Sequence, residues 1–483
     1  MNVNVNGRVS CPTLRFLNVN GTESPRTGVL LSVYAVGTFS PHMSLSRLVL
    51  LASAVRISAR FQPQQIHLAF GGEPDSIAVD FATDADVNCT STGVAFGTSP
   101  AALNMFVPAS SCYYFAGALQ WQSQVKLTGL KAGTTYYYTA GSPAVKYVSW
   151  SEMYSFVMPD TSPTSPPQRV AIFADFGYFN SESLPALIAG AYTGAYDWVI
   201  HAGDIAYDMD WDGGFGKIGA VGSEFLLAIE PIAATRPYMV SPGNHECANN
   251  FTHYRNRFAA LTNFTAKASG SPSNLFYSFD SGLAHYISVD TELFDEFEGG
   301  ELVHNMLTWL EADLTKANAN RHIRPWVMAF GHKCSYMAQN SSLWESLFYS
   351  AGVDMYFCGH VHSYRRWLPF NPMTNVYDKA AANKDASVYT NPRAVVPIVT
   401  GAAGCQEPPA AHCNNDPKST SPSSCGNYGF GILEIANATH AHWTWNTTVP
   451  LNGSSAPKFS DDLWVIVDKH GPRTTQLGDA SGL

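Results

Sequence analysis

The sequence predicts an α/β protein in which a layered β-sandwich flanked by helices follows a smaller all-β sandwich domain. Short segments that alternate apolar and polar residues fill the region before residue 158, whereas near-continuous apolar runs with helical patterns between them fill the region after residue 168. A chain of 483 residues is also too long for one ordinary hydrophobic core. We therefore expect two structured domains.

Residues 62–158 have the pattern of an antiparallel β-sandwich. Six segments rich in β-branched or aromatic residues are separated by turns of Gly, Pro, Asp and Ser. They are Gln65–Phe70, Ser76–Phe81, Gly93–Phe96, Gln124–Leu127, Thr134–Tyr138 and Tyr154–Val157. Six or seven such strands in about a hundred residues are typical of immunoglobulin-like or fibronectin-like domains. Leu127–Leu130 followed by Gly133–Tyr136 resembles the corner before the sixth strand of fibronectin type III domains.

Residues 168–470 have the pattern of a layered α/β domain, and residues 471–483 form a tail. A proline-rich stretch at 159–167 without apolar periodicity predicts a stiff, extended linker before this domain. A helical pattern at 302–314 lies between apolar runs that predict strands buried on both faces. These runs are Val170–Ala174, Trp198–Ile200, Pro237–Val240, Trp326–Phe330, Val353–Cys358 and Val396–Thr400.

Residues 1–61 are interpreted as an upstream extension that ends in a signal peptide at residues 43–59. Met43 is followed by a basic residue, the apolar run Leu48–Val55, and small residues at Ala54 and Ala59. The apolar run is too short to span a bilayer, so no stable membrane insertion is expected. The alternative is an ordinary buried strand. On the first interpretation Met43 is the translation start, and the protein is secreted or delivered to a vacuole or lysosome.

Glycosylation sequons and cysteines also indicate the secretory pathway. Removing the extension deletes one of nine cysteines and leaves eight, an even number that suits disulfides. Cys89 with Cys112, and two of the trio Cys405, Cys413 and Cys425, are the easiest local pairs; the full connectivity stays open. Besides Asn20 in the extension, predicted N-glycosylation sites are Asn88, Asn250, Asn263, Asn340, Asn437, Asn446 and Asn452.

Potential metal ligands occur in five short blocks, each following an apolar run. The blocks are Asp175–Gly177, Gly203–Tyr207, Gly243–Glu246, Gly331–His332 and Gly359–His362. Carboxylate, amide and phenol oxygens together with imidazole nitrogens suit hard and borderline first-row ions rather than a thiolate site. Ligands collect at the carboxyl ends of strands in α/β sheets, so the blocks are expected to converge.

The order and mix of these ligands predict two metal ions that share one carboxylate. Asp204 is the natural bridge, because one carboxylate offers an oxygen to each ion. His360 and His362 are one residue apart and can reach neighbouring ions from a turn. Glycines before Asp204, Asn244, His332 and His360 are expected to let the backbone turn sharply. Each block alone is more typical of an ordinary turn or a buried polar residue, and only the five together favour a metal site.

Charge limits the classes of partner. The formal net charge is −10, and no block of Lys or Arg occurs. This composition argues against nucleic acid or an anionic membrane as the main partner. A small phosphorylated substrate needs local positive charge, which bound metal ions supply.

The five blocks resemble the calcineurin-like metallophosphoesterases and, within that superfamily, the purple acid phosphatases. The superfamily usually opens with Asp-x-His, whereas Gly177 stands at that position here, and Tyr207 follows Asp204 by three residues. This exchange of His for Tyr marks the purple group. The similarity covers roughly residues 62–470. It includes the fibronectin-like domain of large plant-type members, Tyr254, Arg257–Phe258, Arg324–Trp326, and the segments Tyr428–Glu434, Asn437–His440 and Asp462–Trp464, which look like closing strands.

The resemblance implies an acid phosphatase that hydrolyses phosphate monoesters with Fe(III) and a divalent ion (Zn, Mn or Fe), by in-line attack of a metal-bound hydroxide. It implies that Asn244 and His245 contact the substrate phosphate and that His245 assists the leaving group. The implied ferric ligands are Asp175, Tyr207 and His362; the implied ligands of the divalent ion are Asn244, His332 and His360; Asp204 bridges the two ions.

Two positions depart from the family pattern. Ala338–Ser342 contains no His where plant members carry a histidine pair, so the general acid stays open beyond His245. Arg365 stands where the family has Glu. It is either an extra cation that favours highly charged phosphates or a surface arginine.

Two alternative functions stay open at this stage. The same metal site would serve a phosphodiesterase or another phosphohydrolase, because it binds phosphate rather than the leaving group. A non-catalytic secreted or cell-surface binding protein is suggested by the β-sandwich and the many sequons. The sequence gives neither the physiological substrate nor the oligomeric state.

Overall fold

The computed structural model describes residues 62–84, 89, 91–144, 150–294, 300–334, 342–408, 423–448 and 459–473. The predicted extension and signal peptide lie outside the described residues. In the part of the chain that the structure describes, no helix is long and apolar enough to cross a membrane.

The N-terminal domain is a sandwich of two four-stranded sheets, with orders β1-β2-β6-β5 and β4-β3-β7-β8. The six predicted strands are present, and two more, β4 and β5, were not predicted. Lys131 N donates to the hydroxyl of Tyr136 at 3.0 Å, the hydrogen bond of a tyrosine corner. The strands are β1 Gln64–Phe70, β2 Ile77–Asp84, β3 Gly93–Gly97, β4 Met105–Pro108, β5 Ser111–Phe115, β6 Gln120–Leu127, β7 Thr135–Gly141 and β8 Tyr154–Val157.

The second domain is built on two seven-stranded sheets. In one, the order is β13-β11-β9-β24-β25-β26-β21; in the other, it is β14-β15-β16-β17-β22-β18-β23. The first contains β9 Arg169–Phe173, β11 Trp198–Ala202, β13 Tyr238–Ser241, β21 Val388–Thr390, β24 Gly429–Ile435, β25 His440–Thr447 and β26 Ser460–Ile466. The second contains β14 Tyr277–Ser281, β15 Ala284–Ser288, β16 Trp326–Phe330, β17 Met355–Cys358, β18 Ser363–Arg366, β22 Val396–Thr400 and β23 Ser423–Cys425.

Aromatic side chains join the inner faces of these two sheets. Trp443 on β25 packs on Phe357 of β17, with ring centroids 5.1 Å apart, and its indole N–H donates to the hydroxyl of Tyr364 on β18. The layered α/β fold is therefore a β-sandwich with helices outside it, as the sequence predicts. One predicted closing strand is wrong in its placement: residues 437–439 lie in the turn between β24 and β25, where the Asn437 side chain accepts backbone N–H groups, and β25 begins only at His440.

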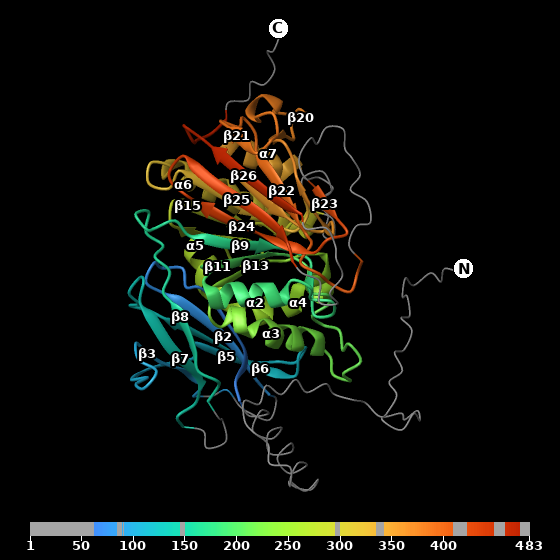
Figure 1. The fold of residues 1–483 in the computed structure, drawn as a ribbon. Helices are drawn as coiled ribbons and strands as arrows, with labels where there is room; N and C mark the ends of the chain where they lie inside the picture. Colours follow the sequence, from blue (N-terminus) through green and yellow to red (C-terminus); the bar gives the residue numbers. More distant parts are fainter. Residues whose placement is uncertain are drawn as a thin grey trace, which may run out of the picture. The chain divides into compact units, whose positions relative to one another are not determined.

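Helices cover the outer faces of the sandwich. Figure 1 shows α2 and α3 side by side along the sheet that contains β9, β11 and β13. On the other sheet, Trp344 of α7 packs on Tyr356 of β17, and α6 contains the predicted helix 302–314. The helices are α2 Leu184–Thr193, α3 Ala220–Ala233, α4 Ala248–Arg257, α5 Lys267–Ser269, α6 Glu301–Ala319 and α7 Ser342–Ala351, with 3₁₀ turns η1 Asn244–Glu246, η3 Glu292–Phe294 and η4 Lys379–Ala381 and a π-helix η2 Leu261–Ala266.

Buried polar contacts join the N-terminal sandwich to α3. The carboxylate of Glu230 accepts hydrogen bonds from Gln65 N at 2.9 Å and from the hydroxyl of Tyr154 at 2.7 Å. The Tyr138 hydroxyl donates to Ala234 O at 2.7 Å. The linker is not a free spacer, because Thr161 in it is buried and accepts a hydrogen bond from Arg324.

Candidate metal centre

Each of the five sequence blocks follows a strand and lies at the same edge of the sandwich. Strands β9, β11 and β13 run parallel in one sheet, and β16, β17 and β22 run parallel in the other. Their carboxyl ends therefore point the same way, and the loops that follow them meet there. A short parallel ladder between β10 (Phe176–Gly177) and β12 (Ile205–Ala206) ties the first two blocks together.

Three of the predicted ligands form one group. The hydroxyl of Tyr207 donates to Asp175 Oδ1 at 3.1 Å and lies 2.6 Å from His362 Nε2. His362 Nε2 is also 3.3 Å from Asp175 Oδ1. A carboxylate, a phenol and an imidazole thus converge on one point. They are the residues for which the resemblance implies a ferric ion.

Three other predicted ligands form a second group. Asn244 Oδ1 lies 3.1 Å from His332 Nε2 and 2.9 Å from His360 Nδ1. His332 Nδ1 donates to Ala202 O at 3.1 Å, which fixes the imidazole so that Nε2 faces the group.

Asp204 is placed to belong to both groups. Its Oδ2 lies 3.0 Å from His332 Nε2, and its charge also acts on Tyr207 of the other group. Asp204, His332 and His360 bring one ligand atom each to within 4.8 Å of one another, close enough to hold a metal ion. Burial raises the pKa of Asp204, but His332 and His245 outweigh burial and hold the pKa well below its usual range.

The backbone beneath these residues is in an uncommon conformation. Asp175, Asp204, Tyr207 and His360 all have φ between 54° and 67°, in the left-handed region that side chains other than glycine rarely adopt. Residues held this way cluster at functional sites, where the surrounding structure fixes them.

The preceding glycines act in two different ways. Only Gly203, with φ of 84°, turns the chain as the sequence predicts. Gly243 and Gly359 have no positive φ and are needed for close approach instead. A Cβ on Gly243 would stand 2.3 Å from Asp204 Oδ1, and one on Gly359 would stand 2.3 Å from Asp175 Oδ2.

The buried carboxylates of the site favour positive charge on the side chains around them. Burial lowers the pKa of His332, but the carboxylate of Asp204 raises it to about 10. Burial lowers the pKa of His362, but Asp175 raises it to about 11. Burial and the charge of Asp175 raise the pKa of the Tyr207 phenol well above its ordinary value. The donor set of oxygens and nitrogens, with buried carboxylates attracting positive charge, fits two metal ions.

His245 lies beside both groups. Its backbone N–H donates to Asp204 Oδ1 at 3.0 Å, and its Nδ1 lies 2.8 Å from Asp208 Oδ1. Burial lowers the pKa of His245, but the hydrogen bond to Asp208 and the charge of Asp204 raise it to about 9. The other ring nitrogen, Nε2, lies 3.9 Å from Asp204 Oδ2.

Sequence reasoning assigned no role to three side chains of the site. Asp208 orients His245, and Glu407 lies near its other nitrogen. Glu246 is buried, and its carboxylate accepts the backbone N–H groups of Asp204, Ile205 and Gly243 at 2.8–2.9 Å. Glu246 stands inside the third block, so its place in the sequence could have indicated a role at the site. Glu407 lies 45 residues after the last block, and its place in the sequence indicated no such role.

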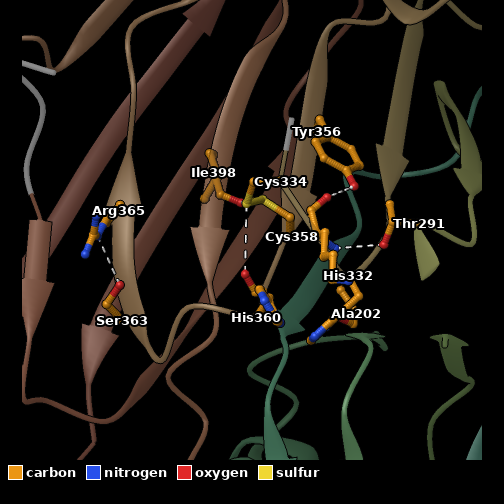
Figure 2. The surroundings of a disulfide bond; sticks show 12 residues. Ala202, Thr291, His332, Cys334, Tyr356, Cys358, His360, Ser363, Arg365 and Ile398 are labelled. Carbon is orange, nitrogen blue, oxygen red and sulfur yellow. Dashed lines mark hydrogen bonds between the residues drawn. A yellow bond between two sulfur atoms is a disulfide. The ribbon is translucent and has the colours of Figure 1, made fainter. Parts of the chain in front are cut away.

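A disulfide between Cys334 and Cys358 ties the two loops that carry His332 and His360 (Figure 2). The predicted Cys89–Cys112 bond is confirmed. Cys425 is also disulfide-bonded, whereas Cys405 is not.

The two departures from the family pattern differ in outcome. The guanidinium of Arg365 donates to Ser363 Oγ at 3.2 Å, on β18 (Figure 2), so the hypothesis of an extra cation in the pocket gains no support. Residues 335–341, which cover most of the segment without histidine, lie outside the described residues. Among the predicted glycosylation sites, Asn250, Asn263, Asn437 and Asn446 are exposed, and Asn88, Asn340 and Asn452 lie outside the described residues.

Three family models match the chain along its length. They are the N-terminal domain of purple acid phosphatase (residues 63–158), calcineurin-like phosphoesterase (168–364) and iron/zinc purple acid phosphatase-like protein C (394–455).

Relatives and a solved structure agree with these models. The chain is 34% identical to human acid phosphatase type 7 over 85% of this chain and 92% of the relative, and 27% identical to purple acid phosphatase 22 of Arabidopsis thaliana over 84% and 86%. A purple acid phosphatase from yellow lupin (Lupinus luteus) seeds shares the fold, with a TM-score of 0.63 at 22% identity over 84% of this chain and 75% of that one. The chain belongs to the purple acid phosphatases, a dinuclear metal-dependent family of calcineurin-like metallophosphoesterases.

Proposed function

We propose that the protein is an acid phosphatase that hydrolyses phosphate monoesters on a centre of Fe(III) and one divalent ion, Zn, Mn or Fe. The observation that carries the proposal is the division of the site into two groups of three donors that share Asp204. Asp175, Tyr207 and His362 hold the ferric ion. Asn244, His332 and His360 hold the divalent ion.

The side chains divide the work of the reaction. The ions, when bound, neutralise the phosphate and activate water for in-line attack. Asn244 and His245 contact the phosphate. His245 holds a proton on Nε2 for the leaving oxygen, and Asp208 on Nδ1 keeps the ring in that orientation and protonation state. At an acidic working pH, the hydrogen bond to Asp208 favours the protonated form of His245.

We also propose that residues 62–158 and 168–470 are separate domains joined at 159–167, and that the protein is secreted or vacuolar. The disulfides Cys89–Cys112 and Cys334–Cys358 suit an oxidising compartment. The exposure of Asn250, Asn263 and Asn446 suits glycosylation. Mass spectrometry of the secreted protein tests both points: a chain beginning near residue 55 or 60, with several N-glycans, is expected.

Colour and turnover test the metal assignment together. Iron-loaded wild-type protein should show a broad visible band from ferric phenolate and should hydrolyse p-nitrophenyl phosphate at pH 5. Tyr207→Phe keeps the ring and removes only the oxygen, so the band should disappear. Asp204→Asn should lose both ions and activity. A colourless wild-type protein with iron bound would refute the assignment of Tyr207 as a ligand of Fe(III). An Asp204→Asn variant with full metal content and turnover would refute the assignment of Asp204 as the bridge.

A further inference from the structure

An acidic side chain stands on the open side of the candidate metal centre. The carboxylate of Glu407 lies 3.8 Å from His245 Nε2 through Oε1 and 3.9 Å from His362 Nε2 through Oε2. The Glu407 side chain is 52% exposed. Glu407 therefore reaches the site from solvent rather than from the core.

The neighbours of Glu407 attach its segment to the site. Gln406 Nε2 donates to Tyr207 O at 3.1 Å, and Asn180 Nδ2 donates to Cys405 O at 2.8 Å. Pro408 O lies 3.4 Å from His362 Nδ1. Since the residues on both sides of Glu407 are bound to the walls of the site, its carboxylate is held at the mouth.

Among the described residues, the charged side chains that lie close to His245 are carboxylates. Asp208, 46% exposed, lies 2.8 Å from the other nitrogen of His245. The cations adjacent to the last two blocks have other partners in the described structure: Lys333 is 2.7 Å from Glu292, and Arg365 donates to Ser363. Two carboxylates, Asp208 and Glu407, thus flank the imidazole of His245.

We infer that Glu407 is a specificity-determining residue that favours phosphate monoesters with neutral or cationic leaving groups over those with anionic leaving groups. The inference rests on the proposed function, in which His245 Nε2 faces the ester's leaving oxygen. The organic part of the ester then extends past His245 toward solvent and passes Glu407. A positive group there is attracted to the carboxylate, and a negative group is repelled by it.

The expected effect is moderate because the carboxylate is half exposed. Two unit charges about 7 Å apart, at an effective dielectric constant of about 40, change kcat/KM roughly five- to tenfold for one added charge on the leaving group. Reversing the charge of the side chain, as in Glu407→Lys, doubles the logarithm of that change in kcat/KM compared with removing the charge. Any effect on the phosphate end is common to all three esters and cancels in the ratio of their kcat/KM values.

Three esters of matched size isolate the charge of the leaving group. They are 2-aminoethyl phosphate, 2-hydroxyethyl phosphate and phosphoglycolate, which end in an ammonium, a hydroxyl and a carboxylate. Wild type, Glu407→Gln and Glu407→Lys are loaded with metal, analysed for metal content and assayed at one pH. Glu311→Gln on α6 is the control, because it removes an exposed carboxylate away from the site.

Wild type and Glu311→Gln should prefer the ammonium ester to the carboxylate ester. Glu407→Gln should reduce the preference for the ammonium ester over the hydroxyl ester about five- to tenfold, and the preference for the ammonium ester over the carboxylate ester by about the square of that factor. Glu407→Lys should invert the second preference. Binding of the non-hydrolysable 2-aminoethylphosphonate and phosphonoacetate should follow the same order. An unchanged preference in Glu407→Gln would overturn the inference, as would loss of metal or of the visible band, which would make Glu407 a ligand. Wild type that hydrolyses none of the three esters would instead refute the proposed function.

Discussion

The Cys334–Cys358 disulfide should stabilise the metal centre as well as the fold. Cys334 follows His332 by two residues, and Cys358 precedes His360 by two, so the bond joins the loops of two histidines in one ligand group. Both sulfurs are buried. Replacing both cysteines by alanine removes the bond without leaving a single reactive thiol to exchange with other cysteines.

The size of the effect follows from the loop and its position. With a sequence separation of 24, the chain-entropy relation gives a loss of about 3.5 kcal/mol in the free energy of unfolding. Loosening the supports of metal ligands typically lowers metal affinity about 10–100-fold. Cys89–Cys112 in the N-terminal sandwich has a separation of 23 and provides a control with almost the same loop length.

Urea unfolding and competition with a chelator measure the two effects separately. Both double variants, Cys334→Ala/Cys358→Ala and Cys89→Ala/Cys112→Ala, should lose similar stability. Only the first should release its metal ions to a lower chelator concentration. The reasoning is refuted if the first variant binds metal as tightly as wild type, or if the two variants lose metal equally.

Three further predictions concern single residues. Glu246→Gln places an amide N–H₂ against backbone N–H donors and should cost about 2–3 kcal/mol of stability, measured by urea unfolding, together with metal affinity. Asp208→Asn should lower the pKa of His245, so the basic limb of the profile of kcat/KM against pH should move to lower pH by about one unit. A basic limb that does not move would show that His245 is not the proton donor. Burial lowers the pKa of His285, but two flanking aspartates raise it to about 9. Protonated His285 therefore stabilises the folded protein fully below the unfolded pKa of about 6.5, and this contribution to the free energy of unfolding is lost as pH rises through 9. The free energy of unfolding of His285→Gln should therefore be lower than that of wild type by up to about 3 kcal/mol at pH 6 and by little at pH 9.5. A difference that does not shrink as pH rises would contradict an ion pair between protonated His285 and the aspartates.

The ligand groups could be predicted because they are tied to strand ends. Asp175, Asn244 and His360 each follow an apolar run, and parallel strands bring such positions to one edge whatever the exact packing. Even the division into two groups was accessible, through the resemblance of the ordered blocks to a known family. The edge strand Met105–Pro108 was not, because its side chains are largely exposed and give no apolar alternation.

Other parts of the site depend on contacts that no local pattern encodes. Glu407 reaches His245 only because the chain after β22 folds back over the second block. The partner of Cys334 was not predicted, although its separation of 24 is close to the 23 of the predicted Cys89–Cys112 pair, because spacing alone does not show that two loops leave adjacent strands. Glu246 was visible in the sequence, but its role as acceptor for three backbone N–H groups depends on the turn at Gly203.

The supports of the site explain how its strained backbone persists. A left-handed conformation costs about 1–2 kcal/mol for a residue other than glycine, and Asp175, Asp204, Tyr207 and His360 all adopt it. Glu246 fixes the backbone of Asp204, and the Asp175 carboxylate accepts the His360 N–H at 2.9 Å. Hydrogen bonds within the protein therefore help to hold the backbone of Asp204 and of His360. Metal ligands must give up their protons, so ion binding at His332 and His362 would compete with the protonation that the neighbouring carboxylates favour.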